Sequence, residues 1–280
     1  MDLKRSGFGV VFGIGLLTGS AAPAADLSRF KIDLLERPLV VVRGAIGPLE
    51  NLRFLIDTGA MPSMVDRRVA KKLGLDVAEG QFVAFGQKTR VTTARLPEIR
   101  LGALRVPGVT AGIGDLSFLG GVDVVVGLDV LSRSSFSIDY DERELVLGPV
   151  SQRDPGVLLD ITPPFLTVQV NIAGRPFRFL VDTGSGRLVL FGRRVLDRLP
   201  ALSPHGELSI NHLSGTSTLK RVLLPSVEAG GSAMERVEAF ISDAKVDDYP
   251  PGIDGVLGIR VLASKRAGFD FERNRLTFAR

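Results

Sequence analysis

One heptapeptide occurs twice in this 280-residue chain. It reads RFLIDTG over Arg53–Gly59 and RFLVDTG over Arg178–Gly184, so each copy is a short apolar run that ends at Asp-Thr-Gly. A second pair of matching segments follows, as VGLDVL at 126–131 and LGIRVL at 257–262. Because both halves carry the same marks in the same order, the sequence predicts one structural unit that is repeated twice.

The repeated unit has the pattern of β-structure. Apolar, β-branched runs at 39–42 and 165–170 predict strands, and so do the runs that lead into each Asp-Thr-Gly. One short helix is expected in each repeat, at 65–73 and at 192–199, because charged and apolar residues alternate there before a glycine or proline.

The two repeats are expected to form separate lobes. Each repeat ends with a predicted hairpin, around 142–143 and 273–274, and proline and glycine punctuate residues 148–160. We therefore place the lobes at 26–150 and 151–280. The predicted fold is all-β and bilobal, with two β-barrel lobes related by a pseudo-two-fold axis and one short helix in each lobe.

The N-terminus has the layout of a secretory signal peptide, which we assign to residues 1–25. A short positive region contains Lys4 and Arg5, an apolar run covers 7–17, and small residues with A-x-A spacing follow. The apolar run is shorter than the ~20 residues that a membrane-spanning helix needs. We expect cleavage near Ala24 or the next alanine, export to the periplasm or the extracellular space, and no stable membrane insertion afterwards. The alternative is an uncleaved anchor.

The composition excludes several kinds of site. The chain has no cysteine, which rules out disulfides, thiolate metal sites and a cysteine nucleophile. Its two histidines, His205 and His212, are too few for a multi-histidine metal centre, and their polar surroundings predict exposed positions. The net charge is +4, and the chain contains no dense block of Lys and Arg of the kind that indicates nucleic-acid binding. Carboxylates, hydroxyls and backbone groups remain for chemistry, and no metal or organic cofactor is implied.

Asp57 and Asp182 are the candidate catalytic residues. A carboxylate at the end of an apolar strand is costly to bury as an isolated charge, and the following Thr and Gly offer a hydroxyl and a backbone N–H that can hold it. The repeat suggests that the two carboxylates face each other and share one proton. Such a pair can act as a base toward water and as an acid toward a leaving amine. The alternative for Asp57 and Asp182 is that each only caps a turn after its strand. For Asp123 and Asp254, which lie four residues before the glycine in the second pair of matching segments, we prefer the role of a turn residue.

These motifs resemble those of the aspartic proteases, especially the retropepsin-like branch found in bacteria. The likeness covers most of 26–280 and implies that Asp57 and Asp182 are the catalytic pair. It also implies a monomer with a complete site, because retroviral members supply one motif per chain and this chain carries both. It carries over threonines whose hydroxyls interlock the two loops, glycines whose N–H groups reach the carboxylates, and glycines packed beneath the loops: Thr58, Thr183, Gly59, Gly184, Gly127 and Gly258.

Two features depart from the pepsin pattern. Ser185 follows the second motif and can donate a hydroxyl hydrogen bond to Asp182, whereas Ala60 follows the first motif and offers no such donor. We therefore expect the shared proton to rest more on Asp57. The only tyrosines, Tyr140 and Tyr249, lie outside the candidate flaps, so a pepsin-type flap tyrosine is absent.

Each repeat can supply a hairpin that acts as a substrate-binding flap, at 82–91 and at 208–219. The turns of these hairpins are expected at Gly86, Gln87, Ser214 and Gly215. Apolar side chains that follow the two motifs are expected to line the substrate pockets. These are Met61, Met64, Val65, Leu188 and Leu190.

The sequence thus predicts an exported aspartic endopeptidase that holds an extended protein or peptide substrate between its lobes. The substrate would pair its backbone with the flap edges as an added strand. The alternative is a catalytically silent peptide-binding or scaffolding protein that keeps the fold. The intact pair of aspartates favours the enzyme, whereas Ala60 and the missing flap tyrosine keep the alternative open. Tight binding of a statine-type transition-state mimic distinguishes the two.

Overall fold

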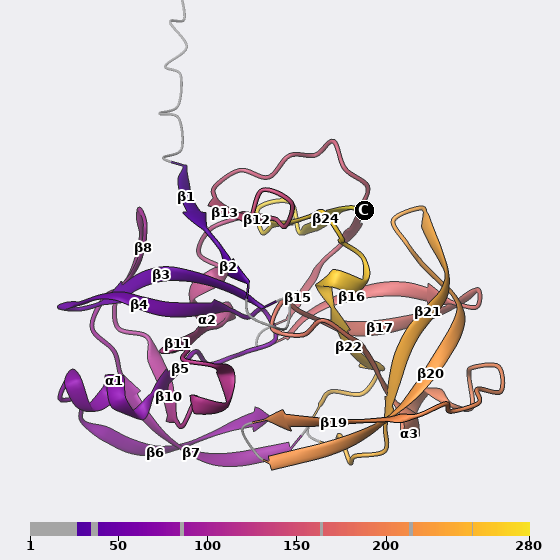
Figure 1. Cartoon of the computed structure of the whole chain (residues 1–280), viewed down its shortest axis with the longest axis horizontal. Coiled ribbons are helices and arrows are strands. Elements are labelled where there is room, and N and C mark those ends of the chain that lie inside the picture. The colour runs from indigo at the N-terminus through magenta and orange to yellow at the C-terminus, as the bar shows by residue number, and fades with distance from the viewer. Residues whose placement is uncertain (1–26, 35–38, 85–86, 163–164, 213–214, 248) are drawn as a thin grey trace, which may run out of the picture.

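The computed structural model describes residues 27–34, 39–84, 87–162, 165–212, 215–247 and 249–280 (Figure 1). The predicted signal peptide lies outside the described residues, as do the candidate flap residues Gly86 and Ser214. In the described part of the chain, no helix is both long and apolar enough to cross a membrane. Strands are the main secondary structure and are arranged in two lobes, so the predicted all-β, bilobal fold is confirmed.

The N-terminal half forms a sheet with the strand order β6-β7-β10-β5-β11-β4-β3-β8-β9, and β2 pairs with β3. Most pairs are antiparallel, but β11 runs parallel to β4, with Val125 opposite Leu55. The elements of this half are β1 (Ser28–Lys31), β2 (Asp33–Leu34), β3 (Val40–Ile46), β4 (Leu49–Ile56), β5 (Met64–Asp66), α1 (Arg67–Lys72), β6 (Val77–Ala84), β7 (Gln87–Arg95), β8 (Ile99–Leu101), β9 (Leu104–Val106), β10 (Thr110–Gly114), η1 (Ser117–Leu119), β11 (Val124–Val126), α2 (Leu128–Leu131), β12 (Phe136–Asp139) and β13 (Glu144–Leu147).

The C-terminal half repeats this plan with the strand order β15-β16-β17-β22-β18-β21-β20-β19. Here β22 runs parallel to β17, with Val256 opposite Leu180, and a further pairing between β16 and β20 closes the sheet into a barrel. The elements of this half are β14 (Gly156–Leu158), β15 (Asp160–Thr162), β16 (Phe165–Ile172), β17 (Arg175–Asp182), β18 (Leu188–Phe191), α3 (Gly192–Val195), β19 (Glu207–His212), β20 (Gly215–Ala229), β21 (Ser232–Ser242), β22 (Gly255–Gly258), η2 (Ile259–Val261), β23 (Arg266–Asp270) and β24 (Arg275–Ala279).

A third sheet joins the two halves, in the order β1-β13-β12-β23-β24-β14. The two predicted terminal hairpins are β12–β13 and β23–β24, and β12 pairs antiparallel with β23. At one end of this pairing Phe136 lies opposite Phe269, and their rings stack with centroids 4.6 Å apart. Both residues are fully buried. The hairpins therefore connect the lobes through one continuous sheet, an arrangement that the sequence analysis did not predict.

The two predicted helices, α1 and α3, are shorter than the sequence suggested, and the first half has a further short helix, α2, that was not predicted. In the first half, residues 64–66 form β5, which pairs with β10 and β11, so the helix begins only at Arg67. Asp66 caps it by accepting a hydrogen bond from the N–H of Arg68. In the second half the helix ends at Val195. In the first half, strand pairing thus includes residues that the helical pattern alone assigns to the helix, whereas in the second half the residues after Val195 form a turn.

Candidate active site

Asp57 and Asp182 lie at the carboxyl ends of equivalent strands. Asp57 follows β4 and donates its N–H to the carbonyl of Val126 over 3.0 Å, while Asp182 ends β17, opposite β22. The two loops then meet closely. A Cβ placed on Gly59 would lie 2.7 Å from Cγ of Asp182, and one on Gly184 would lie 2.6 Å from Cγ of Asp57. Each carboxyl therefore packs against the glycine of the opposite motif, where no larger residue fits.

The two threonines of the motifs interlock across the lobe boundary. Thr58 Oγ1 donates to the carbonyl of Val181 over 2.8 Å and accepts from the N–H of Thr183 over 3.1 Å. Thr183 Oγ1 donates to the carbonyl of Ile56 over 2.7 Å and accepts from the N–H of Thr58 over 3.0 Å. Both side chains are buried, so these four hydrogen bonds hold the two aspartate loops in a fixed relation.

The environment of the two carboxyls favours a shared proton. Burial raises the pKa of both Asp57 and Asp182, and the negative charge of Asp57 raises the pKa of Asp182 further. The N–H of Gly59 donates to Oδ1 of Asp57 over 2.8 Å and opposes this rise, as the N–H of Gly184 does at Asp182. In the described part of the chain, Oδ1 of Asp182 is buried without a hydrogen-bond partner. The pair can therefore hold one proton and offer both an acceptor and a donor.

Ser185 contributes differently from the prediction. Its backbone N–H, rather than its hydroxyl, favours the ionised form of Asp182, and its Oγ accepts a hydrogen bond from the N–H of Arg187 over 3.3 Å. The hydroxyl contact on which the argument for a proton on Asp57 rests is therefore not among the hydrogen bonds that the structure describes for Asp182, and the position of the shared proton stays a prediction.

One glycine in each half packs against the aspartate loop of that half. A Cβ on Gly127 would lie 2.3 Å from the carbonyl oxygen of Ala60, and one on Gly258 would lie 2.4 Å from that of Ser185. The first loop has an additional tie. Ser63 donates its hydroxyl to Oδ1 of Asp129 over 2.6 Å and its N–H to Oδ2 over 3.0 Å. These contacts leave the aspartate loops little room to move.

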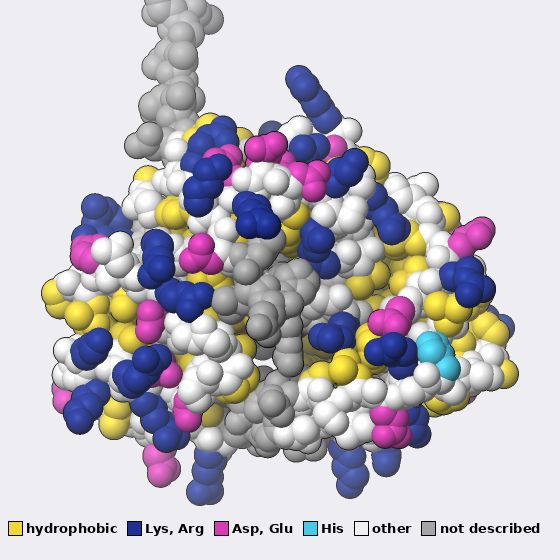
Figure 2. All heavy atoms as spheres, viewed as in Figure 1, with side chains coloured by type: hydrophobic (Ala, Val, Ile, Leu, Met, Phe, Trp, Pro, Cys, Tyr) yellow, Lys and Arg dark blue, Asp and Glu magenta, His cyan; other side chains and the backbone are white. Residues whose placement is uncertain are grey.

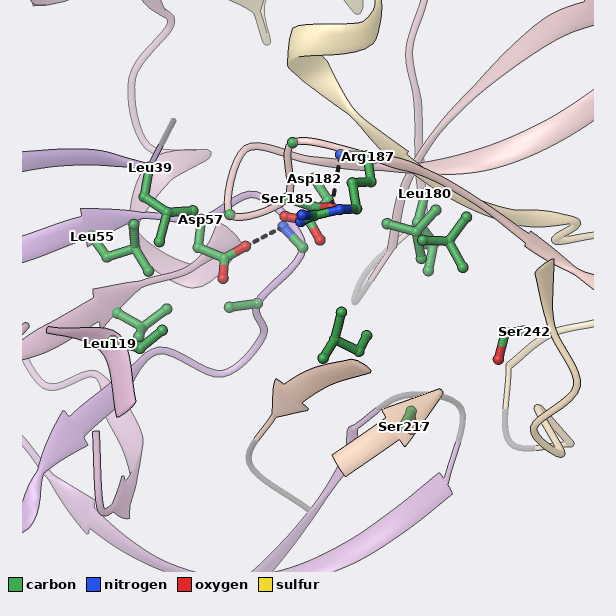
Figure 3. Close-up of a pocket in the computed structure, with 18 of the residues that line it drawn as sticks. Leu39, Leu55, Asp57, Leu119, Leu180, Asp182, Ser185, Arg187, Ser217 and Ser242 are labelled. Carbon is green, nitrogen blue, oxygen red and sulfur yellow. Dashed lines mark hydrogen bonds between the residues drawn. The ribbon is translucent and has the colours of Figure 1, made fainter. Parts of the chain in front are cut away.

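A groove with a volume of about 290 Å³ opens above the two aspartates and is lined by both lobes. Figure 3 shows Leu39, Leu55 and Leu119 beside Asp57, and Leu180 on the side of Asp182. Most of the lining is apolar, as expected. Its further members include Met61, Met64, Leu116, Phe118, Val125, Val189, Phe191, Ile210, Leu219, Val246, Tyr249 and Val256.

Three of the predicted lining residues are instead part of the core. Val65, Leu188 and Leu190 are fully buried in the main hydrophobic cluster. Successive side chains of a strand point to opposite faces, so Val189 of β18 faces the groove while its two neighbours face the barrel interior. Met61 and Met64 do line the groove.

Two hairpins occupy the positions of the candidate flaps. In the first, β6 pairs with β7 and Gln87 lies opposite Ala84; in the second, β19 pairs with β20 and Gly215 lies opposite His212. Figure 1 shows both hairpins along the same edge of the molecule, one from each lobe. Ile210 of the second hairpin reaches the groove lining.

Comparison with known proteins agrees with this geometry. A sequence profile of the aspartyl protease family matches residues 40–130 and 168–261, which together are more than half of the chain. The chain belongs to the aspartyl protease family. Both matched segments contain one Asp-Thr-Gly motif and one of the supporting glycines. A search of curated proteins returned no match.

Two solved structures illustrate the likeness of the fold. The aspartic proteinase from Irpex lacteus is 14% identical and aligns with a TM-score of 0.52 over 90% of this chain and 98% of its own length. A retropepsin-like aspartic protease from Rickettsia conorii is 19% identical, with a TM-score of 0.35 over 44% of this chain and 91% of its own. The first of these supports the bilobal protease fold for the whole chain.

The other polar residues considered in the sequence analysis lie outside the catalytic pair. Asp123 and Asp254, predicted as turn residues, each accept a backbone N–H at the strand that leads to a catalytic motif, from Arg53 and Arg178 respectively, over 2.9 Å. His205 is exposed, and the side chain of His212 lies outside the described residues. Among the described residues, no group of three His, Cys, Asp or Glu side chains is arranged to hold a metal ion.

Sequence reasoning missed Arg187 and Tyr249 as groove residues. Tyr249 stacks on Phe191, with ring centroids 5.4 Å apart, and so forms an aromatic wall in the C-terminal lobe. Neither residue belongs to a recognisable motif, and both reach the groove only through the folding of the loops around β18. The spacing of Arg187, five residues after Asp182, was the only signal in the sequence that could have indicated it.

Proposed function

We propose that this protease is an exported aspartic endopeptidase that cleaves peptide bonds with water activated between Asp57 and Asp182. The observation that carries this proposal is the reciprocal packing of the two carboxyls against Gly59 and Gly184 at the floor of an apolar groove. Two carboxyls in such contact cannot both ionise easily, as is known for aspartic proteases in general.

The chemistry follows from the single proton of the pair. The ionised carboxyl accepts a proton from a water molecule while the oxygen of that water bonds to the carbonyl carbon of the substrate. The protonated carboxyl donates its proton to the carbonyl oxygen, which gives a tetrahedral intermediate. The carbon–nitrogen bond then breaks as the amine nitrogen takes the proton from the pair. A hydroxyl of the intermediate returns its proton to the carboxylates as the carboxylic acid product forms, so one proton again remains between the two aspartates.

The groove suits an extended polypeptide. It lies between the lobes, its walls are mostly apolar, and the β6–β7 and β19–β20 hairpins offer strand edges to a substrate backbone. Because both motifs lie in one chain, we propose that a monomer is active on protein or peptide substrates and that nucleic acid is not a partner. On the face shown in Figure 2, Lys and Arg side chains are interspersed with Asp and Glu. Export rests on the signal-peptide pattern of residues 1–25.

The test is hydrolysis of a peptide library by purified protein that begins at Asp26. We expect the parent protein to cleave between apolar residues and to be inhibited by a statine-type mimic. The D57N and D182N variants should each lose cleavage. Tight binding of peptides without cleavage by the parent protein would favour the scaffolding alternative. Export is tested separately, by fractionating cells that express the full chain and determining the N-terminal residue of the exported form.

A further inference from the structure

The two walls of the groove are built from equivalent rows of residues. In the N-terminal lobe the strand register aligns Leu55, Val125, Met64, Gly112 and Thr93, on β4, β11, β5, β10 and β7. The first three of these line the groove. The row thus begins with aliphatic side chains beside Asp57 and ends with a glycine and a small hydroxyl.

The matching row of the C-terminal lobe ends differently. It aligns Leu180, Val256, Val189, Phe240 and Arg221, on β17, β22, β18, β21 and β20. Again the first three line the groove and are aliphatic. The positions that hold a glycine and a threonine in the first lobe hold an aromatic ring and a guanidinium in the second. The two rows therefore match where they line the groove and differ on the strands beyond it.

A second guanidinium reaches the same ring. Arg187 lines the groove, and its Cζ lies 5.6 Å from the ring centroid of Phe240, while Cζ of Arg221 lies 5.8 Å from it. The residue at the position of Arg187 in the first repeat is Pro62, which carries no charge. Glu238 lies beside Arg221, 3.5 Å from its Nε. Two guanidinium groups therefore lie near one aromatic ring, and one of them, that of Arg187, belongs to a residue that lines the groove.

The backbone of Arg187 is held in place. Its N–H donates to Oγ of Ser185 over 3.3 Å, and its carbonyl accepts the N–H of Gly258 over 2.7 Å. Figure 3 shows the side chain on the same side of the pocket as Asp182, opposite the leucines around Asp57. Arg187 therefore presents its charge from a defined position five residues after one catalytic aspartate.

We propose that Arg187, assisted by Arg221, forms a subsite for an acidic substrate side chain. A peptide with Asp or Glu on the Asp182 side of the cleaved bond and apolar residues on the Asp57 side would match both walls. A guanidinium binds a carboxylate through charge-assisted hydrogen bonds that are stronger than neutral ones, and an aromatic ring under it restricts its motion. This subsite rests on the proposed endopeptidase function and specifies its substrate class.

The experiment uses a set of peptides in which one position at a time holds Glu or its neutral isostere Gln. At one position on one side of the cleaved bond, we expect kcat/KM of the parent protein to be about tenfold higher for Glu than for Gln, the size of a charge-assisted hydrogen bond. R187Q should lower this ratio toward one, and R187K should retain part of it. R193Q is the matched control, because Arg193 is exposed on α3 and is not among the groove residues. Its ratio should equal that of the parent.

Two results would overturn the inference. One is a Glu-to-Gln ratio near one at every position for the parent protein; the other is an unchanged ratio in an R187Q protein whose melting temperature matches the parent. Complete absence of cleavage sinks the proposed function instead, and the subsite is then read from binding of the same peptides to the parent protein. The preference for Glu should also shrink as salt rises from 50 to 500 mM, because the contact is between charges.

Discussion

Removing one hydroxyl from the threonine interlock should destabilise the protein and disturb the site together. In T58V the side chain keeps its shape but loses the oxygen that donates to the carbonyl of Val181 and accepts the N–H of Thr183. Both backbone partners lie in the buried contact between the lobes. A buried polar group that is left without its partner costs about 1–3 kcal/mol. We therefore expect a loss of about 3 kcal/mol in the free energy of unfolding.

This loss can be measured as a change in melting temperature. For a chain of about 250 residues, 1 kcal/mol corresponds to roughly 2–4 °C, so T58V should melt roughly 6–12 °C lower. Peptide cleavage should fall by about tenfold or more even well below the melting temperature, because the hydroxyl sets the relative position of the two aspartate loops. T58S keeps the hydroxyl and should stay close to the parent in both measurements.

T277V is the matched control for loss of a buried hydroxyl away from the aspartates, since Thr277 is buried in β24. It should leave cleavage near the parental value. The reasoning is refuted if T58V melts within 2 °C of the parent and cleaves peptides at a similar rate. It is also refuted if T277V and T58V reduce cleavage equally, because the effect would then not depend on the interlock.

Three further outcomes are expected. D57N and D182N should each remove nearly all cleavage while circular dichroism shows a folded protein, because the pair acts as one unit; substantial turnover by either variant contradicts a shared proton. Burial raises the pKa of both carboxyls, so the stability that the pair contributes is present below about pH 4 and is lost as the pH rises through the raised pKa values. D182N should therefore lose less melting temperature than the parent between pH 4 and pH 7, and an equal loss argues against the raised pKa. Specific activity should stay constant on dilution to nanomolar concentrations, and a steep fall together with a dimer in sedimentation would show that one chain is insufficient.

The aspartate pair could be predicted from the sequence because its geometry is mostly local. An apolar strand, a turn and a glycine without a side chain suffice to place Asp57, and the repeat places Asp182 in the same way. The close contact of each glycine with the opposite carboxyl explains why the motif tolerates no larger residue. The supporting glycines, Gly127 and Gly258, were carried over from the resemblance to the aspartic proteases, and the structure places each of them against the carbonyl oxygen of a loop residue.

Features that depend on distant strands could not be predicted in this way. The pairing of β12 with β23 brings together hairpins that are far apart in the chain, and neither hairpin alone indicates its partner. The helix at 65–73 was predicted too long, because residues 64–66 pair with β10 and β11. Register also decides which side chains face the groove, which is why Val189 lines it and Leu188 does not.

The two halves have diverged wherever their symmetry is not required by the aspartates. After the supporting glycine, the first half has Asp129, which ties the loop of its own lobe through Ser63. The equivalent residue of the second half is Arg260, which lies 4.1 Å from the ring centroid of Tyr140 in the other lobe. One half thus uses this position to hold its own catalytic loop, and the other uses it to hold the lobes together. In a dimer of identical halves, both copies of this position would hold the same residue. Only one of the two contacts could then form, and it would form twice. In a single chain with two repeats, the surroundings of the two aspartates can therefore match while the lobe contacts and the groove walls differ between the halves. A symmetric dimer of identical halves cannot combine these two properties.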